Sequence, residues 1–197
     1  SFLKILENHI RSNSITGFIT FLRGTEYICG HNILKHDLKY IQNAVNDSGI
    51  NPSNVIDTLF LSPLLFPAKP YHALLKDDKL QTEDANNPVN DSLKSKDLFF
   101  DEVAVFQQMD ESLKQILYVL LNDTKEFNAF FHFIAYSSIV ANVEKLILEK
   151  FNAEICEKVN LTKIISEHPI ELAYALTLIN CRNRYSISSN VSCRCLW

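Results

Sequence analysis

Two aspartates, Asp37 and Asp91, stand at places in the sequence where a carboxylate can bind a metal ion. Asp37 follows the turn Gly30-His31-Asn32, and Asp91 lies at the start of a second amphipathic segment. Carboxylates that converge on a pair of divalent ions can hydrolyse a phosphodiester, because one ion generates hydroxide and the other stabilises the leaving oxygen. The two aspartates therefore predict part of a two-metal centre.

The spacing of apolar residues predicts strands and helices that position these aspartates. The apolar run at 27–29 ends at Gly30 and predicts a buried strand, and residues 54–60 predict a strand, or a strand entering a helix, that ends near 62–63. Apolar residues at helical spacing predict a helix over 35–48, with Asp37 in its first turn. Helix starts and loops gather at the C-terminal edge of a parallel sheet, so Asp37 and Asp91 can both point there.

Helices are predicted in most of the remaining sequence. A short amphipathic helix is expected at 14–22, followed by a stop at Gly24, and a polar loop is expected at 76–91, ending in an N-cap at 90–92. Beyond Met109 apolar periodicity predicts helices within 113–121 and 127–148, and a last helix that starts at Pro169. We place a boundary near residue 110, which divides the chain into an α/β domain (1–110), a helical connector (111–187) and a tail without periodicity (188–197).

Composition excludes several classes of protein. The net charge of −4 argues against a protein that grips duplex nucleic acid mainly by neutralising phosphates. The four glycines, at positions 17, 24, 30 and 49, cannot form a P-loop. The five cysteines are unevenly spaced and predict no disulfide framework, which favours a reducing cytoplasm. Apolar runs are too short to cross a bilayer, and the start of the chain is not typical of a secretory signal.

The pattern Gly-His-Asn-Ile-x-x-His-Asp-Leu-x-Tyr-Ile at 30–41 resembles the second motif of the DnaQ-like (DEDD) 3′–5′ exonucleases. Residues 56–59 resemble the strand that follows this motif, and Asn90-Asp91-Ser92 occupies the place of the third motif. Within that superfamily, residues 61–67, 71–77 and 86–91 most resemble the nuclease-like N-terminal region of certain bacterial RecQ-type DNA helicases. The resemblance covers about 14–109, and 169–176 is similar to the connector before the helicase domains.

The resemblance implies an α/β fold, a truncated ribonuclease H-like exonuclease fold followed by an all-helical segment. The implied activity is metal-dependent hydrolysis of single-stranded DNA from its 3′ end, with ATP-dependent helicase domains downstream that serve DNA repair or recombination. By the same resemblance, Mg²⁺ or Mn²⁺ would be held by Asp37 and Asp91, and substrate would be positioned by Asn32 and Asn86. His31 and His72 are the candidates for a catalytic base.

Two departures from the family pattern argue against activity in this chain. The family's first motif, Asp-x-Glu on the opening strand, is absent from the sequence, and it would supply two more metal ligands. In addition, Asn86 or Asn87 stands where the family has a histidine or tyrosine before the third-motif aspartate, and an amide cannot accept a proton from water near neutral pH. The chain is therefore expected to be nearly inactive.

Structural roles remain open for each of these side chains. Asp37 and Asp91 can serve as helix N-terminal residues, and His31 and His72 as hydrogen-bonding groups in loops. Asp57 is expected to serve a turn or a backbone hydrogen bond rather than a metal.

Other parts of the sequence have simple structural interpretations as well. Asp101 and Glu102 are expected on a solvated helix face. The aromatic cluster at 127–133 is expected in the core.

Two alternative functions follow from these observations. One is a non-catalytic module that keeps the exonuclease-like fold to hold DNA or a partner. The other is an unrelated helical interaction protein, which predicts no central sheet.

Overall fold

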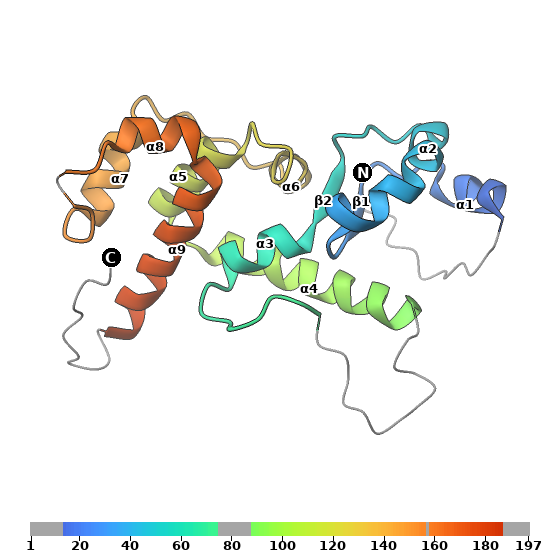
Figure 1. The fold of residues 1–197 in the computed structure, drawn as a ribbon, viewed down its shortest axis with the longest axis horizontal. Coiled ribbons are helices and arrows are strands. Elements are labelled where there is room, and N and C mark those ends of the chain that lie inside the picture. The colour runs from blue at the N-terminus through green and yellow to red at the C-terminus, as the bar shows by residue number, and fades with distance from the viewer. Residues whose placement is uncertain (1–13, 75–87, 157, 187–197) are drawn as a thin grey trace, which may run out of the picture.

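The computed structural model describes residues 14–74, 88–156 and 158–186, and it combines many helices with a small parallel sheet (Figure 1). The elements, in chain order, are α1 (Ile15–Leu22), β1 (Ile28–Gly30), the π-helix η1 (Ile33–Asp37), α2 (Leu38–Ser48), β2 (Val55–Asp57), α3 (Thr58–Leu65), α4 (Pro88–Gln108), α5 (Glu111–Leu121), α6 (Asn128–Phe133), α7 (Val143–Phe151), α8 (Leu161–Glu167) and α9 (Pro169–Ser186). The mixed α/β character predicted from the sequence is confirmed. The helical alternative predicts no central sheet, and the described residues contain a short parallel pair of strands.

The sheet consists of β1 and β2, which pair in parallel with Ile28 opposite Val55 and Gly30 opposite Asp57. Parallel strands cannot be joined by a tight turn, so the chain crosses over between them through η1 and α2. Helix α1 packs on α2, and a small buried cluster of Leu22, Val45 and Ile50 holds this N-terminal part together. Both strands end at the same edge of the sheet, which therefore places the turn after β1 beside the start of α3.

The helix predicted over 35–48 begins differently from the prediction. Residues Ile33–Asp37 form a π-helix, in which the N–H of Leu38 donates to the carbonyl of Ile33, five residues back. Asp37 is thus the last residue of the π-turn and directly precedes α2, instead of lying within the first turn of an α-helix. Single π-turns occur frequently at functional sites. This turn alters the direction in which the side chains at 33–37 leave the backbone.

The prediction for 54–60 holds for its strand, but the predicted end near 62–63 is wrong. Strand β2 passes directly into α3, because Asp57 accepts a hydrogen bond from the N–H of Leu59 at 2.9 Å and so caps the helix. Helix α3 continues through Pro63 to Leu65. The turn chemistry of Asp57 thus makes the C-terminal end of the strand and the start of the helix a single structural unit.

Helix α4 starts earlier than the sequence predicts. It begins at Pro88, so the residues at 88–91 are helical, not part of a loop, and Asp91 lies in the first turn, not at the cap. The rest of the predicted loop, 76–87, lies outside the described residues, as does the tail at 188–197. Helix α4 packs against both β1 and α3, so its buried face covers the sheet.

The principal core is aromatic. Phe127, Phe130 and Phe131 are fully buried, as predicted, and Phe106 meets the rings of Phe130 and Phe131 edge to face at 5.5 and 5.8 Å. The same buried cluster contains residues of β2, α3 and α4 and of every helix from α5 to α9. One continuous core therefore lies on both sides of residue 110, where Asp110 caps α5.

Beyond residue 110 the prediction is partly right. Helices α5 and α9 occur where periodicity predicted them, and Pro169 begins α9. The single helix predicted over 127–148 is wrong, because α6 ends at Phe133 and Ala135 adopts a left-handed φ of 51°. Asn142 then caps α7 through a 2.8 Å bond from the N–H of Lys145. None of the helices in the described part of the chain has the length and apolar character needed to cross a membrane.

Candidate functional site

The buried carboxylate of Asp57 fastens the turn after β1 to the end of β2. Its Oδ1 accepts the N–H of Asn32 at 2.8 Å and that of Leu59 at 2.9 Å, and its Oδ2 accepts the N–H of Leu34 at 3.0 Å. The residue is fully inaccessible to solvent. Hydrogen bonds to an ionised acceptor are stronger than those between neutral groups. The predicted turn role of Asp57 is confirmed, and this carboxylate fixes the backbone that leads to Asp37.

Asn32 adopts the left-handed conformation that this turn requires. Its φ and ψ are 63° and 23°, a region that asparagine enters more readily than most residues with a side chain. Its backbone N–H is one of the donors to Asp57. Asn32 therefore shapes the turn, and its predicted contact with substrate remains a prediction. Asn86 lies outside the described residues.

Gly30 permits the turn to close tightly over Ile33. A Cβ at position 30 would lie 3.1 Å from the Cβ of Ile33 and 3.2 Å from its Cδ1. We expect Gly30→Ala to lower the free energy of unfolding by about 1 to 3 kcal/mol, as overpacking of a tight contact does. Urea unfolding followed by circular dichroism measures this loss, and an unchanged midpoint would show that Ile33 can move aside freely.

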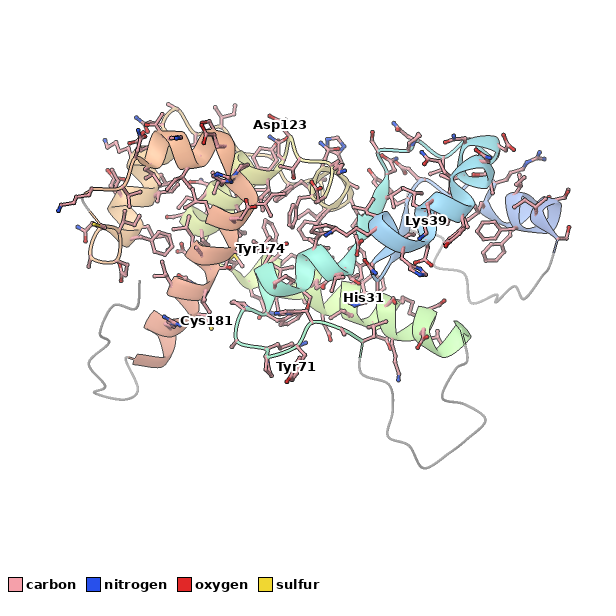
Figure 2. The ribbon with its side chains drawn as sticks, viewed as in Figure 1. His31, Lys39, Tyr71, Asp123, Tyr174 and Cys181 are labelled. Atoms are coloured by element: carbon pink, nitrogen blue, oxygen red, sulfur yellow. The ribbon has the colours of Figure 1, made fainter. Side chains whose placement is uncertain are left out.

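His31 lies beside the start of α3, where Figure 2 labels it. Its Nδ1 shares a hydrogen bond of 2.9 Å with the hydroxyl of Thr58. Burial lowers the pKa of His31, and the negative charge of Asp57 opposes this shift. His31 is thus a neutral imidazole near pH 7 with one nitrogen engaged by Thr58, which is the structural role left open for it.

His72 lies in the segment after α3 and bonds the helix. Its Nδ1 is 3.0 Å from the hydroxyl of Ser62, which is itself buried. Burial and the nearby charge of Lys69 lower the pKa of His72. The imidazole anchors the segment that leaves α3. The catalytic role predicted for His72 and His31 remains a prediction.

The two predicted metal ligands are both exposed. Although Asp37 precedes α2, its side chain makes no capping bond to that helix, and its carboxylate interacts with His36 at 3.1 Å. Asp91 lies in the first turn of α4, where its carbonyl accepts the hydroxyl of Ser95 at 2.8 Å. The capping role is therefore not seen for the Asp37 side chain, and its carboxylate is accessible from solvent.

The described residues do not complete a metal centre. No three His, Cys, Asp or Glu side chains within 14–74, 88–156 and 158–186 come together as possible ligands. A catalytic pair of divalent ions needs several carboxylates around it. Asp37 and Asp91 by themselves do not fit the complete two-metal site that the family resemblance implies.

Glu102, on α4, is a buried acid, and the prediction of a solvated face for it is wrong. The residue is fully buried, and neither carboxyl oxygen has a hydrogen-bond partner among the described residues. Burial raises the pKa of Glu102 to about 9, with Lys69 opposing and Asp57 and Asp101 adding to the shift. Glu102 is thus an uncharged acid at pH 7.

The position of Glu102 was visible in the sequence. Phe99 precedes it by three residues and Phe106 follows by four, so all three side chains share the helix face that packs on the sheet. Cys29 of β1 lies near it, and burial raises the pKa of the Cys29 thiol, with the ionised forms of Glu102 and Asp57 adding to the shift. A carboxyl group on the same helix face as two phenylalanines indicates a buried acid.

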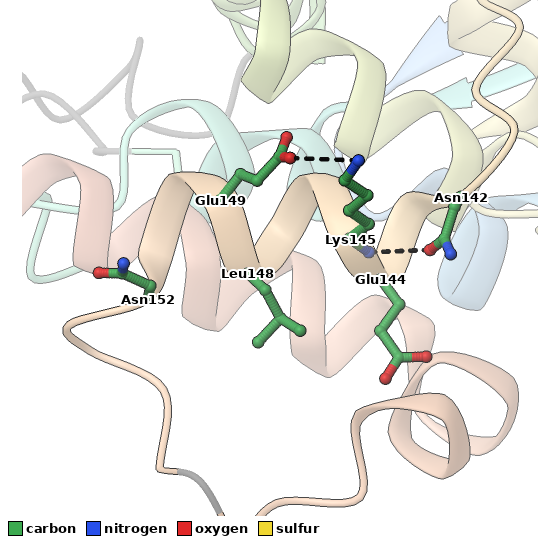
Figure 3. Close-up of a pocket in the computed structure, with 6 residues that line it drawn as sticks. All are labelled: Asn142, Glu144, Lys145, Leu148, Glu149 and Asn152. Carbon is green, nitrogen blue, oxygen red and sulfur yellow. Dashed lines mark hydrogen bonds and ion pairs between the residues drawn. The ribbon is translucent and has the colours of Figure 1, made fainter.

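A surface pocket of about 550 Å³ lies along α7, in the helical part of the molecule (Figure 3). Its lining residues are Asn142, Glu144, Lys145, Leu148, Glu149 and Asn152. Several of their polar groups already bond to neighbours, since Lys145 pairs with Glu149 at 3.6 Å and Glu144 accepts the hydroxyl of Thr162 at 2.7 Å. None of the predicted site residues lines this pocket.

Comparisons with protein-family models, with curated proteins and with solved structures found no match to this chain. Function is therefore inferred from the motif at 30–41 and from the geometry around it.

Proposed function

We propose that this chain is a nucleic-acid-processing module of the DnaQ-like 3′–5′ exonuclease type, which acts on the 3′ end of single-stranded DNA within a RecQ-type helicase. In this proposal the β1–α2–β2 unit belongs to a ribonuclease H-like sheet, and the helices after residue 110 connect it to helicase domains. The proposal follows the resemblance of 30–41 and 86–92 to exonuclease motifs.

The observation that carries the proposal is the way Asp37 is presented. The turn at 31–34 is held by two backbone hydrogen bonds to the Asp57 carboxylate, which also accepts the N–H of Leu59 in α3. Asp37 follows this turn with an exposed carboxylate that does not cap its helix. In open α/β sheets, ligands bind at the C-terminal ends of the strands. A rigid turn at that edge, followed by an exposed carboxylate whose partner is the neighbouring His36, suits a ligand-binding role better than a purely structural one.

A second candidate is a non-catalytic module that binds DNA or a partner. It is favoured because the described residues bring together no three metal ligands, and because His31 and His72 both bond to hydroxyls. In this candidate, the unit retains an exonuclease-like fold without catalytic activity. The two candidates differ in whether Asp37 and Asp91 act on the same cation.

Calorimetric titration with Mn²⁺ separates the two candidates. The exonuclease-type proposal predicts weak but specific heat in the wild type that is lost in both Asp37→Ala and Asp91→Asn. Asp47→Asn, which alters an exposed aspartate of α2, is the matched control and should leave the heat unchanged. The absence of specific heat in the wild type would favour the non-catalytic module and contradict a shared metal site.

Hydrolysis of a 3′-labelled oligonucleotide is expected to be nearly absent in this chain, because Asp37 and Asp91 alone cannot hold two ions. Product release in Mg²⁺ or Mn²⁺ is measured on a denaturing gel, with EDTA as the blank. Robust degradation that disappears in Asp37→Ala would contradict this expectation and show that the missing first motif is not required.

A further inference from the structure

An exposed aromatic ring lies beside a lysine and a histidine at the start of α2. Tyr40 is 71% exposed, and the Nζ of Lys39 lies 4.7 Å from the centroid of its ring. The ring of His36 meets Tyr40 at a centroid distance of 6.2 Å in an edge-on arrangement. Large aromatic side chains bury roughly 150 to 250 Å² when they are covered, so such exposure leaves substantial binding surface open.

The two lysines of this segment are not neutralised by acids of the described chain. Lys35 and Lys39 are both exposed, and neither forms an ion pair with a described carboxylate. The Nζ of Lys35 lies 4.9 Å from the centroid of Phe60. Asp37 is the acid within this segment, and its carboxylate pairs with His36. The segment thus combines an exposed ring with two exposed lysines, although the whole chain carries −4.

We propose that Tyr40 is a base-stacking subsite for single-stranded nucleic acid, and that Lys35 and Lys39 contact the phosphates on either side of the stacked base. Aromatic stacking with neighbouring cations is how proteins hold single strands without reading their sequence. A single strand fits because its bases expose their faces, whereas those of a duplex are stacked on one another. The subsite gives the substrate-binding side of the proposed function, and it rests on that proposal for its link to Asp37.

The position of Tyr40 along the chain connects it to the predicted metal ligand. Tyr40 follows Asp37 by three residues, and side chains at that spacing on a helix are neighbours, about 5 to 6 Å apart at Cβ. A nucleotide stacked on Tyr40 would therefore lie close to the Asp37 carboxylate, where a divalent cation held by Asp37 would meet its phosphate. The fixed turn at 31–34 sets where α2 begins, and so where this ring stands.

Fluorescence anisotropy with a labelled oligothymidylate, in EDTA so that no hydrolysis occurs, tests the subsite. Tyr40→Ala is expected to weaken binding about 5- to 150-fold, which corresponds to the loss of one stacked base, and Tyr40→Trp is expected to preserve it. Tyr71→Ala is the matched control: Tyr71 is 77% exposed, and no described lysine or arginine lies over its ring. Circular dichroism spectra verify that each variant is folded.

Two further measurements separate stacking from charge. An abasic oligonucleotide of equal length should bind wild type and Tyr40→Ala alike, because it has no base to stack. The double variant Lys35→Gln, Lys39→Gln should flatten the dependence of log K on log salt by about 1.4, because each phosphate that a lysine neutralises on a single strand adds about 0.7 to the slope. If Tyr40→Ala binds oligothymidylate as the wild type does, or if the wild type does not bind it, the subsite is wrong.

The DNA-binding test of Tyr40 and the Mn²⁺ titration of Asp37 and Asp91 can fail independently of each other. Binding in EDTA that depends on Tyr40, without Mn²⁺ heat at Asp37 and Asp91, would leave the subsite intact and refute the metal-dependent proposal. Mn²⁺ binding with DNA affinity independent of Tyr40 would refute the subsite alone.

Discussion

Replacing Asp57 by alanine is expected to lower the free energy of unfolding by about 3 to 5 kcal/mol. The substitution removes the acceptor for the N–H groups of Asn32, Leu34 and Leu59. A buried donor left without its partner costs about 1 to 3 kcal/mol, and solvent does not reach Asp57 to replace the carboxylate. Urea unfolding at pH 7, followed by circular dichroism, measures the loss.

Asparagine should not rescue this position. Its amide oxygen could keep the two bonds that Oδ1 makes with Asn32 and Leu59, but the NH₂ group would face the N–H of Leu34 in place of Oδ2. Two donors would then oppose each other. Asp47→Ala, on the exposed face of α2, should change stability by less than about 0.5 kcal/mol. If Asp57→Ala were no less stable than Asp47→Ala, the turn would not depend on the carboxylate.

Local signals in the sequence predicted most of the helices and both strands. Ser14, Gly24 and Pro169 each mark a helix end by their own chemistry, and the apolar periods of α2 and α5 reflect faces that are buried. Such signals depend only on neighbours in the chain. They also predicted a turn role for Asp57, because an aspartate after a strand finds backbone donors within a few residues.

The features that the sequence did not predict depend on contacts between distant segments or on small differences in backbone conformation. The π-turn at Ile33–Asp37 adds a residue to one helical turn, and apolar spacing does not report this. The break after Phe133 runs against an apolar sequence: Tyr136 donates to Glu111, 25 residues earlier, at 2.8 Å. Periodicity continues through such a break, so a single helix was predicted.

The candidate site could be predicted only in outline. The motif at 30–41 identified the turn and the aspartate that follows it, and the structure shows how the turn is built. The motif could not show that the second aspartate lies on an exposed turn of α4. Nor could it reveal that Tyr40 stands open beside Lys39, because exposure is a property of the fold.

Glu102 makes the free energy of unfolding depend on pH, with stability falling as pH rises. The folded-state pKa of about 9 lies above the unfolded value of 4.5. Between these values the folded protein holds a proton that the unfolded chain has released, so the stability contributed by Glu102 is fully present below about pH 4.5 and is lost as pH rises toward 9. The slope is at most about 1.4 kcal/mol per pH unit.

The free energy of unfolding of Glu102→Gln is therefore expected to gain on that of the wild type as pH rises. Between pH 5 and pH 8 the difference between the two proteins should shift by up to about 4 kcal/mol in favour of the variant. The amide has nearly the same shape as the protonated acid and cannot ionise, so the variant lacks this downward slope. Urea unfolding of both proteins at pH 5, 6, 7 and 8 measures the difference, and titrations common to both proteins cancel. Asp97→Asn, at an exposed position of α4, should run parallel to the wild type. If Glu102→Gln also ran parallel, the acid would be ionised in the folded protein, and α4 could not cover the sheet as tightly as it does here.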